Sequence, residues 1–134
     1  MPHHAHARKP TVLVVDDAPL NREVAQLHLE SVGLAIDTAE DGLRAMALAQ
    51  QNAYALILMD MQMPRLDGLE ATKRIRELPG YRTTPIIAMT ANAFAEDKAR
   101  CLEAGMSDFL SKPFDPDSLF ASVLRGLSQR DLIS

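Results

Sequence analysis

The sequence predicts an α/β fold, a doubly wound parallel sheet of five strands flanked by five helices. Short apolar runs alternate along the chain with longer segments whose apolar residues recur at helical spacing. The runs are mostly continuous rather than alternating in polarity, which is typical of strands that helices cover on both faces. Regular alternation of strands and helices favours parallel strands joined by right-handed crossovers.

The strands are expected at five runs that turn residues or helical patterns separate from one another. These runs are Thr11–Val15, Ala35–Ala39, Leu56–Met59, Ile86–Met89 and Phe109–Leu110. Most contain the β-branched or large apolar residues that suit a buried strand.

The first three helices carry recognisable start and stop signals. Pro19 suits the first turn of a helix and Gly33 suits its C-terminal cap. The residues that recur at helical spacing between them are Leu20, Val24, Leu27 and Ser31. Asp41 is expected to cap the second helix, which carries Leu43, Met46 and Ala47. Asp67 and Glu70 have the spacing of a capping box for the third helix, which is expected to run to Leu78.

The last two helices are predicted in the same way. A short helix is expected through Lys98, Leu102 and Ala104, ending at Gly105. Asp115 is expected to cap the final helix, with Pro116 at its first position. The inner face of that helix is assigned to Leu119, Val123 and Leu127.

The composition indicates one soluble domain. The chain has 134 residues, of which 47% are hydrophobic and 24% charged, and its net charge of −4 argues against nonspecific binding of nucleic acid. We expect a flexible arm at residues 1–9, a domain at residues 10–130 and a tail at residues 131–134. A single cysteine, Cys101, and the lack of a signal peptide or apolar span predict a cytoplasmic location without membrane contact.

Polar residues follow four of the predicted strands. Asp16 and Asp17 follow the first strand, Asp60 the third, Thr90 the fourth and Lys112 the fifth. Carboxyl ends of parallel strands meet at one edge of a sheet, where ligands bind in open α/β folds. Clustered carboxylates repel one another unless a cation lies among them, and lysine and threonine suit an anion. The pattern predicts a site for a metal ion and a phosphate.

With these residues placed, the chain resembles the receiver domain of two-component response regulators, and among these it is most similar to receivers attached to hybrid sensor histidine kinases. The motifs that carry the resemblance are Val-Val-Asp-Asp (14–17), Met-Asp-Met-Gln-Met-Pro (59–64) with Asp67-Gly68, Ala-Met-Thr-Ala (88–91) and Lys-Pro-Phe (112–114). The resemblance implies a flavodoxin-like sheet with strand order 2-1-3-4-5.

The resemblance also implies phosphoryl transfer to Asp60 from the phosphohistidine of a histidine kinase or a histidine phosphotransfer domain. Mg²⁺, with Mn²⁺ as a substitute, is implied at Asp16, Asp17, Asp60 and the backbone carbonyl of Gln62. One of the two adjacent aspartates is expected to act through water. Carboxylates, retained waters and phosphate oxygens are the ligands that Mg²⁺ prefers.

Lys112 and Thr90 are implied to bind the phosphoryl oxygens, and Thr90 with Phe109 to form a switch that changes a partner-binding surface. The isolated chain is not expected to be an enzyme beyond phosphorylating itself and slowly losing the phosphoryl group. If it was excised from a hybrid protein, the parent would be a sensor histidine kinase; a stand-alone regulator remains the alternative.

Two other classes of protein share parts of this pattern. A phosphatase of the haloacid dehalogenase type also uses an aspartate nucleophile with Mg²⁺, threonine and lysine. It needs a general acid two residues after the nucleophile, where this chain has Gln62. A flavodoxin-like flavin protein would need a phosphate-binding loop after the first strand, where this chain has Asp-Asp-Ala-Pro (16–19).

Overall fold

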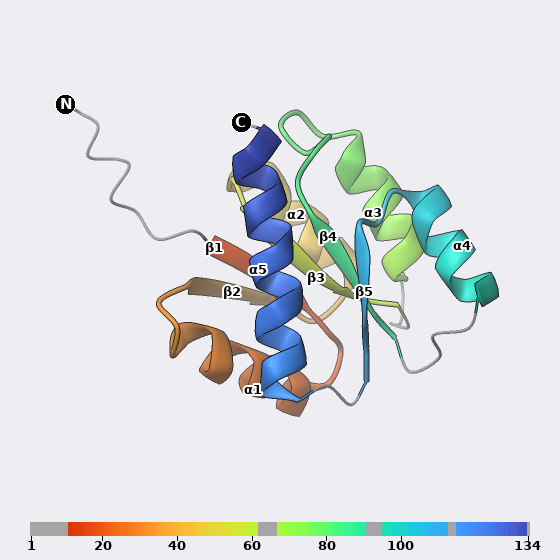
Figure 1. The fold of residues 1–134 in the computed structure, drawn as a ribbon. Helices are drawn as coiled ribbons and strands as arrows, with labels where there is room; N and C mark the ends of the chain where they lie inside the picture. Colours follow the sequence, from red (N-terminus) through yellow and green to blue (C-terminus); the bar gives the residue numbers. More distant parts are fainter. Residues whose placement is uncertain (1–10, 62–66, 91–94, 113–114, 134) are drawn as a thin grey trace.

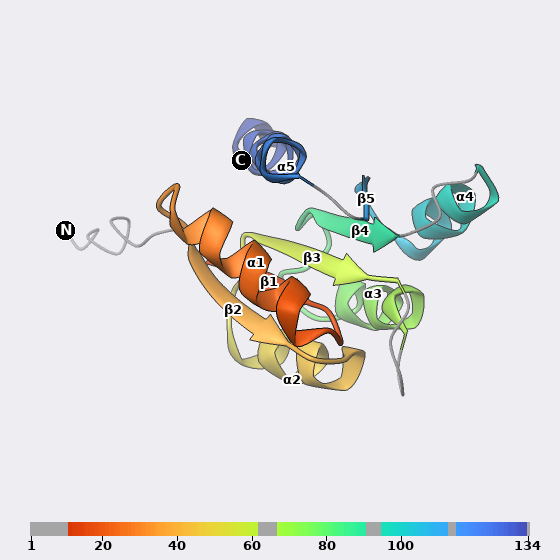
Figure 2. The ribbon, with the colours of Figure 1, turned by 90° about the horizontal axis from the view of Figure 1, so that it is seen from below.

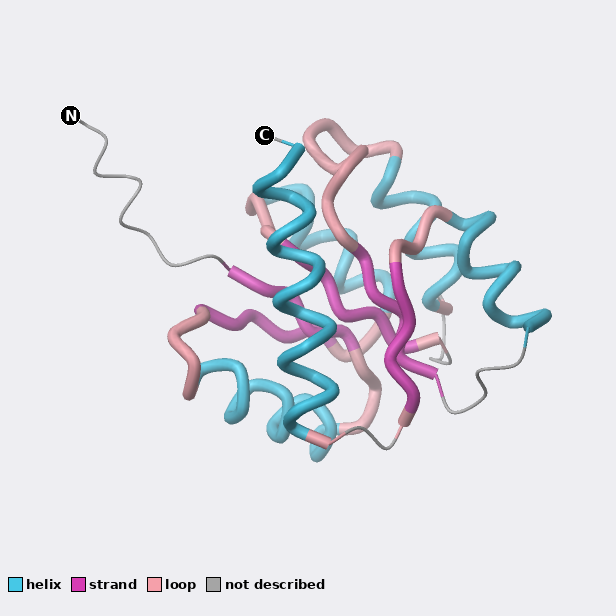
Figure 3. Tube along the Cα trace, viewed as in Figure 1, coloured by secondary structure: helices cyan, strands magenta, loops and turns pink. Residues whose placement is uncertain are grey.

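The strands form a single parallel sheet in the computed structural model, which describes residues 11–61, 67–90, 95–112 and 115–133 (Figures 1 and 3). The strands are β1 (Thr11–Val15), β2 (Ala35–Ala39), β3 (Leu56–Asp60), β4 (Ile86–Thr90) and β5 (Asp108–Ser111). Their order across the sheet is β2-β1-β3-β4-β5, and every neighbouring pair is parallel. The predicted fold class and strand order are confirmed.

Helices cover both faces of the sheet. They are α1 (Pro19–Glu30), α2 (Gly42–Gln51), α3 (Gly68–Arg76), α4 (Ala95–Ala104) and α5 (Pro116–Ile133). Figure 2 shows α5 on the face opposite α2 and α3, while α4 lies beside α3 near the β5 edge. Within the described part of the chain, no helix combines the length and apolar character needed to cross a membrane.

Two apolar layers form the core because successive strand residues point to opposite faces. Leu13 and Ile57 belong to the layer under α2, α3 and α4, whereas Val14 and Leu58 belong to the layer under α1 and α5. All four side chains are fully buried. Burial on both faces explains why the strand sequences are continuously apolar.

Aspartate caps start three of the helices, as the sequence predicts. In each, a carboxylate oxygen accepts a hydrogen bond from the backbone N–H three residues later: Asp41 from Arg44 at 2.8 Å, Asp67 from Glu70 at 2.9 Å and Asp115 from Ser118 at 2.7 Å. The Glu70 side chain pairs with Arg74 at 3.2 Å along α3. Gly33 and Gly105, which follow α1 and α4, have the positive φ angles expected of C-terminal caps.

Some details differ from the predictions. Helix α1 packs on the sheet through Ala25 and Leu29, while Leu20 and Leu27 are each 68% exposed. The helical periodicity was therefore right, but larger apolar side chains lie on the solvent side. Strand β5 is longer than the apolar pair at 109–110, because the parallel pairing with β4 extends over Asp108 and Ser111. Helix α3 ends at Arg76, before Leu78, and α5 continues beyond residue 130 to Ile133.

Candidate functional site: an acidic pocket at the carboxyl edge of the sheet

The fold brings the predicted polar residues to one edge of the sheet. Asp16 directly follows β1, Asp60 is the last residue of β3, Thr90 is the last of β4, and Lys112 directly follows β5. The pairing of β4 with β5 places Ser111 opposite Thr90, and the Lys112 backbone N–H donates to the Thr90 carbonyl at 2.8 Å. Residues that are almost a hundred positions apart in the sequence therefore meet at one rim.

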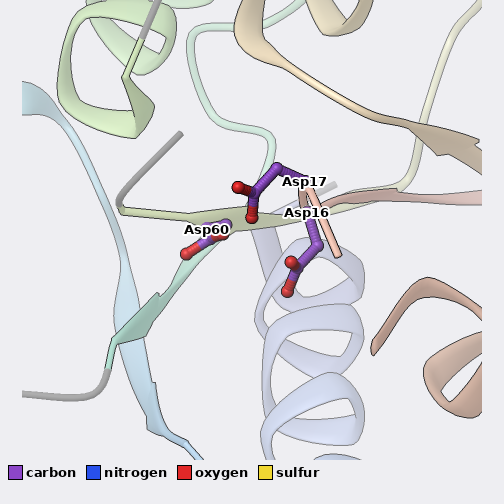
Figure 4. Close-up of side chains that lie close together, drawn as sticks. All are labelled: Asp16, Asp17 and Asp60. Carbon is purple, nitrogen blue, oxygen red and sulfur yellow. The ribbon is translucent and has the colours of Figure 1, made fainter. Parts of the chain in front are cut away.

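Three carboxylates lie together at this rim (Figure 4). One oxygen each from Asp16, Asp17 and Asp60 can be chosen so that all lie within 4.8 Å of one another. Asp16 and Asp60 are buried, at 0% and 4% exposure, whereas Asp17 is exposed. Two buried negative charges at this separation repel by roughly 3 kcal/mol at an effective dielectric constant of about 20. The cluster therefore needs positive charge.

Lys112 supplies part of that charge. Its Nζ lies 3.0 Å from Asp16 Oδ2 and 3.1 Å from Asp60 Oδ1, so the ammonium group bridges the two buried carboxylates. Burial alone would lower the pKa of Lys112, but the hydrogen bonds to Asp16 and Asp60 and their charges outweigh it and raise the pKa. The lysine is therefore held in its charged form between these two residues.

The remaining charge imbalance fits a divalent cation. Three carboxylates against one ammonium leave two negative charges, and carboxylate oxygens are the hard donors that Mg²⁺ binds. Asp17 is the exposed member of the cluster and has no hydrogen bond or ion pair among the described residues. The predicted backbone ligand, Gln62, lies outside the described residues.

The segment that carries Asp16 is tied down by contacts that the sequence analysis missed. Asp16 Oδ1 accepts from the Ala18 backbone N–H at 2.9 Å, and Oδ2 accepts from Asn21 Nδ2 at 3.3 Å. Arg22 Nη1 donates to the Asp16 backbone carbonyl at 2.7 Å. The available signal was the polar pair Asn21 and Arg22 in the first turn of α1, because side chains on a helix point back toward its N-terminus and so toward the preceding loop.

Phe109 lies on β5, next to the rim. Its ring is half-buried against the core layer under α3 and α4, and the Lys98 ammonium of α4 lies 5.8 Å from the ring centroid. The residue also lines a groove of about 380 Å³ together with α5 residues such as Ser118 and Arg125. The predicted switch residue therefore lies on β5 and borders both α4 and α5.

A parallel sheet in this strand order, with an acidic cluster bridged by lysine at its carboxyl edge, defines a domain of the doubly wound α/β class, in which ligands usually bind at that edge. The family model of the response regulator receiver domain matches residues 12–124, and the chain belongs to that family. This membership agrees with the motif resemblance. It leaves the alternatives of a dehalogenase-type phosphatase and a flavin protein without support.

Similar proteins are sensor kinases and other receivers. The chain is 46% identical over 108 residues to sensor histidine kinase RcsC of Salmonella typhi, covering 81% of this chain and 11% of the kinase. It is 42% identical over 130 residues to sensor protein GacS of Pseudomonas syringae pv. syringae, covering 93% of this chain and 14% of that protein. The chain thus spans only a small part of these relatives.

Solved structures share the fold. The receiver domain of sensor histidine kinase PA1611 from Pseudomonas aeruginosa, with a magnesium ion coordinated in its active-site cleft, is 40% identical with a TM-score of 0.84 over 90% of this chain and 99% of that one. Chemotaxis protein CheY4 of Vibrio cholerae is 33% identical with a TM-score of 0.88, over 90% and 100% of the two chains.

Proposed function

We propose that this receiver accepts a phosphoryl group from a phosphohistidine onto Asp60, and that the reaction requires Mg²⁺ or, as a substitute, Mn²⁺. One observation carries the proposal: Lys112 Nζ bridges Asp16 and Asp60, and Asp17 lies beside them with a free approach from solvent. A nucleophilic carboxylate, a fixed cation and a cluster of oxygen donors are the parts that phosphoryl transfer to aspartate needs.

The chemistry divides among the residues of the pocket. An Asp60 carboxylate oxygen attacks phosphorus, the P–N bond to the donor imidazole breaks, and the imidazole leaves with the electron pair of that bond. Lys112, already charged beside Asp60, binds a phosphoryl oxygen, and the Thr90 hydroxyl binds another. Asp16, Asp17, Asp60 and the Gln62 carbonyl would hold Mg²⁺, which would supply positive charge beside the phosphoryl group when bound. Asp16, whose oxygens already accept hydrogen bonds from Ala18 and Asn21, would hold the ion through water.

Phosphorylation of the intact protein tests the proposal. Acetyl phosphate with Mg²⁺ should add the mass of one phosphoryl group, stable in acid and lost in base, with slow loss at neutral pH. Asp60→Asn should abolish the labelling, whereas Asp117→Asn, which removes an exposed carboxylate in the first turn of α5, should leave it unchanged. Labelling of Asp60→Asn to the level of the unmodified protein would contradict the assignment.

We further propose that the chain works in a phosphorelay as part of, or together with, a hybrid sensor kinase, and passes the phosphoryl group to a histidine phosphotransfer domain. The similarity to RcsC and GacS supports this proposal. A partner surface is available on α1, where Leu20 and Leu27 are exposed on one side of the helix that starts at the acidic pocket. An apolar stripe of this kind suits docking against another helical domain.

Phosphoryl transfer to a phosphotransfer domain of the same organism requires docking, whereas labelling by acetyl phosphate does not, so the two measurements separate docking from chemistry. Leu20→Ser with Leu27→Ser should slow transfer to that domain at least about tenfold while leaving labelling by acetyl phosphate unchanged. Leu102→Ser, at an exposed leucine of α4, is the matched control and should leave both reactions intact. If no phosphotransfer domain takes the phosphoryl group and a DNA-binding protein instead associates with the phosphorylated form, a stand-alone regulator is the better account.

A further inference from the structure

Two side chains at the start of α1, those of Asn21 and Arg22, hold the segment that carries Asp16 and Asp17. Arg22 Nη1 donates to the backbone carbonyl of Asp16 at 2.7 Å, and Asn21 Nδ2 donates to the Asp16 carboxylate at 3.3 Å. Both side chains are half-buried. Helix α1 has no side-chain cap at Ala18; the Ala18 N–H instead donates to Asp16 Oδ1. The start of the helix and the acidic segment are thus fastened to each other through Asp16.

The bond from Arg22 bears on Asp17 as well. The Asp16 carbonyl belongs to the peptide group that joins Asp16 to Asp17, and this group is planar. The hydrogen bond from Arg22 to the Asp16 carbonyl oxygen therefore fixes the orientation of this plane, which contains the Asp17 Cα. Asp17 has no hydrogen bond or ion pair of its own among the described residues, so the direction of its carboxylate depends on the backbone that Arg22 holds.

The geometry points to Arg22 as a positioning residue, supported by Asn21, that aims the Asp17 carboxylate into the pocket and thereby sets the affinity for Mg²⁺. The inference rests on the proposed Mg²⁺-dependent function. Groups that orient metal ligands without touching the metal commonly change its affinity by about tenfold or more. A charge-assisted hydrogen bond from a guanidinium, which stays protonated at all relevant pH values, suits this purpose.

The sign of the effect separates positioning from simple electrostatics. Removing a positive charge near a cation site strengthens cation binding if the charge acts only through its field. Removing a residue that orients a ligand weakens binding. Arg22→Met should therefore weaken Mg²⁺ binding about tenfold, measured by calorimetry without a phosphodonor. Arg22→Lys keeps the charge, but a lysine does not reproduce the planar guanidinium fork, so it should remain weaker than the unmodified protein.

Arg44→Met is the matched control, because Arg44 is an exposed arginine at the start of α2 whose side chain has no hydrogen bond or ion pair among the described residues. It should leave the affinity within about twofold. In metal-free protein, exchange of the Ala18 amide should accelerate in Arg22→Met and Asn21→Ala, since its acceptor Asp16 loosens.

Unchanged or tighter Mg²⁺ binding by Arg22→Met would overturn the inference, and so would a loss of folding stability with no change in affinity. If the unmodified protein itself binds no Mg²⁺, the proposed function fails instead. Exchange of the Ala18 amide then still reports whether Arg22 and Asn21 hold Asp16.

Discussion

Gly68, the first residue of α3, lies directly against the backbone carbonyl of Asp60. A β-carbon at Gly68 would overlap the Asp60 carbonyl oxygen and lie 3.1 Å from Met59 Cγ, and Gly68 itself is buried. The start of α3 therefore supports the end of β3 at the residue proposed to carry the phosphoryl group. This close approach explains why glycine follows the Asp67 cap.

Gly68→Ala should displace either α3 or the end of β3, because the added methyl group meets backbone rather than a flexible side chain. We expect a loss of about 1–3 kcal/mol of unfolding free energy, measured with urea, together with slower labelling by acetyl phosphate. Gly126→Ala is the comparison: its β-carbon would meet the Leu56 side chain at 2.6 Å, away from the pocket. It should cost stability without slowing labelling, and equal slowing in both variants would contradict the argument.

Lys112→Met should destabilise the metal-free protein by about 3 kcal/mol at neutral pH, because it leaves Asp16 and Asp60 buried without their shared cation. The raised pKa of Lys112 gives its contribution a definite pH dependence. That contribution is complete below the unfolded value near 10.5 and disappears as the pH rises through the higher folded value. Urea unfolding between neutral and alkaline pH measures it.

Two tyrosines also contribute to the alkaline pH dependence of stability, because the pKa of each is raised in the folded protein. Burial, with the hydrogen bond to Asp37 and its charge, raises the pKa of Tyr54, and burial raises that of Tyr81. Their contributions also fall as the pH rises above the unfolded tyrosine value. The double variant Lys112→Met with Tyr54→Phe should therefore show a shallower alkaline decline than either single variant. If the unfolding free energy of Lys112→Met fell with pH in parallel with that of the unmodified protein, Lys112 would be excluded as a source of the alkaline decline.

Asp17→Asn should act oppositely on the metal-free and metal-bound protein. Asp17 adds a negative charge beside two others and has no partner among the described residues. Neutralising it should raise the stability of the metal-free protein by less than about 1 kcal/mol and abolish the stabilisation by Mg²⁺. Thermal unfolding with and without Mg²⁺ checks both effects, with Asp117→Asn as a control. Undiminished stabilisation by Mg²⁺ would show that Asp17 is not a ligand.

The strands and the clustering of polar residues were predictable because both depend on local pattern and on a general property of parallel sheets. Val12–Val15 are buried on both faces of the sheet, and Asp16, which follows them, must then lie at the carboxyl edge. The buried side of α1 was less predictable. Leu20 and Leu27 are larger than Ala25, yet the crossover geometry turns Ala25 toward the sheet. Apolar size alone does not determine which side of a helix is buried.

Long-range contacts to backbone atoms had no signal in the sequence. Arg76 at the end of α3 donates to the Gly105 carbonyl through Nε at 3.0 Å and Nη2 at 2.6 Å. Its Nη1 donates to the Tyr81 and Thr84 carbonyls at 2.7 and 2.6 Å. Every residue has a backbone carbonyl, so the residue types in the sequence do not show which carbonyls will accept a hydrogen bond. The sequence therefore identifies Arg76 only as one of several basic residues in the last turn of α3.

Arg76→Met should destabilise the protein by about 3 kcal/mol, because three carbonyl groups lose donors in a partly buried site. Burial lowers the pKa of Arg76, although an arginine stays charged at neutral pH. Arg76→Lys should recover only a small part of the stability, since one ammonium group cannot reach the carbonyls of Gly105, Tyr81 and Thr84 together. Urea unfolding compares the variants with Arg74→Met, whose partner is the exposed Glu70. Stability of Arg76→Lys equal to that of the unmodified protein would contradict this account.

Phe109 should reorient when Asp60 is phosphorylated, because Thr90 is expected to move toward the new phosphoryl oxygens and leave space for the ring. Addition of beryllofluoride, a phosphoryl mimic, should shift amide and aromatic resonances from the Asp60 pocket through Phe109 to α4.

The Lys98 ammonium, 5.8 Å from the Phe109 ring centroid, stabilises the present ring orientation by about 0.5–1 kcal/mol. Lys98→Ala should therefore lower the beryllofluoride concentration needed for half-conversion by about two- to fivefold. Lys73→Ala, at an exposed lysine of α3, should leave this concentration unchanged. Resonance changes confined to the pocket would show that Phe109 is a core residue rather than a switch. Equal midpoints in the two lysine variants would show that Lys98 does not stabilise the present ring orientation.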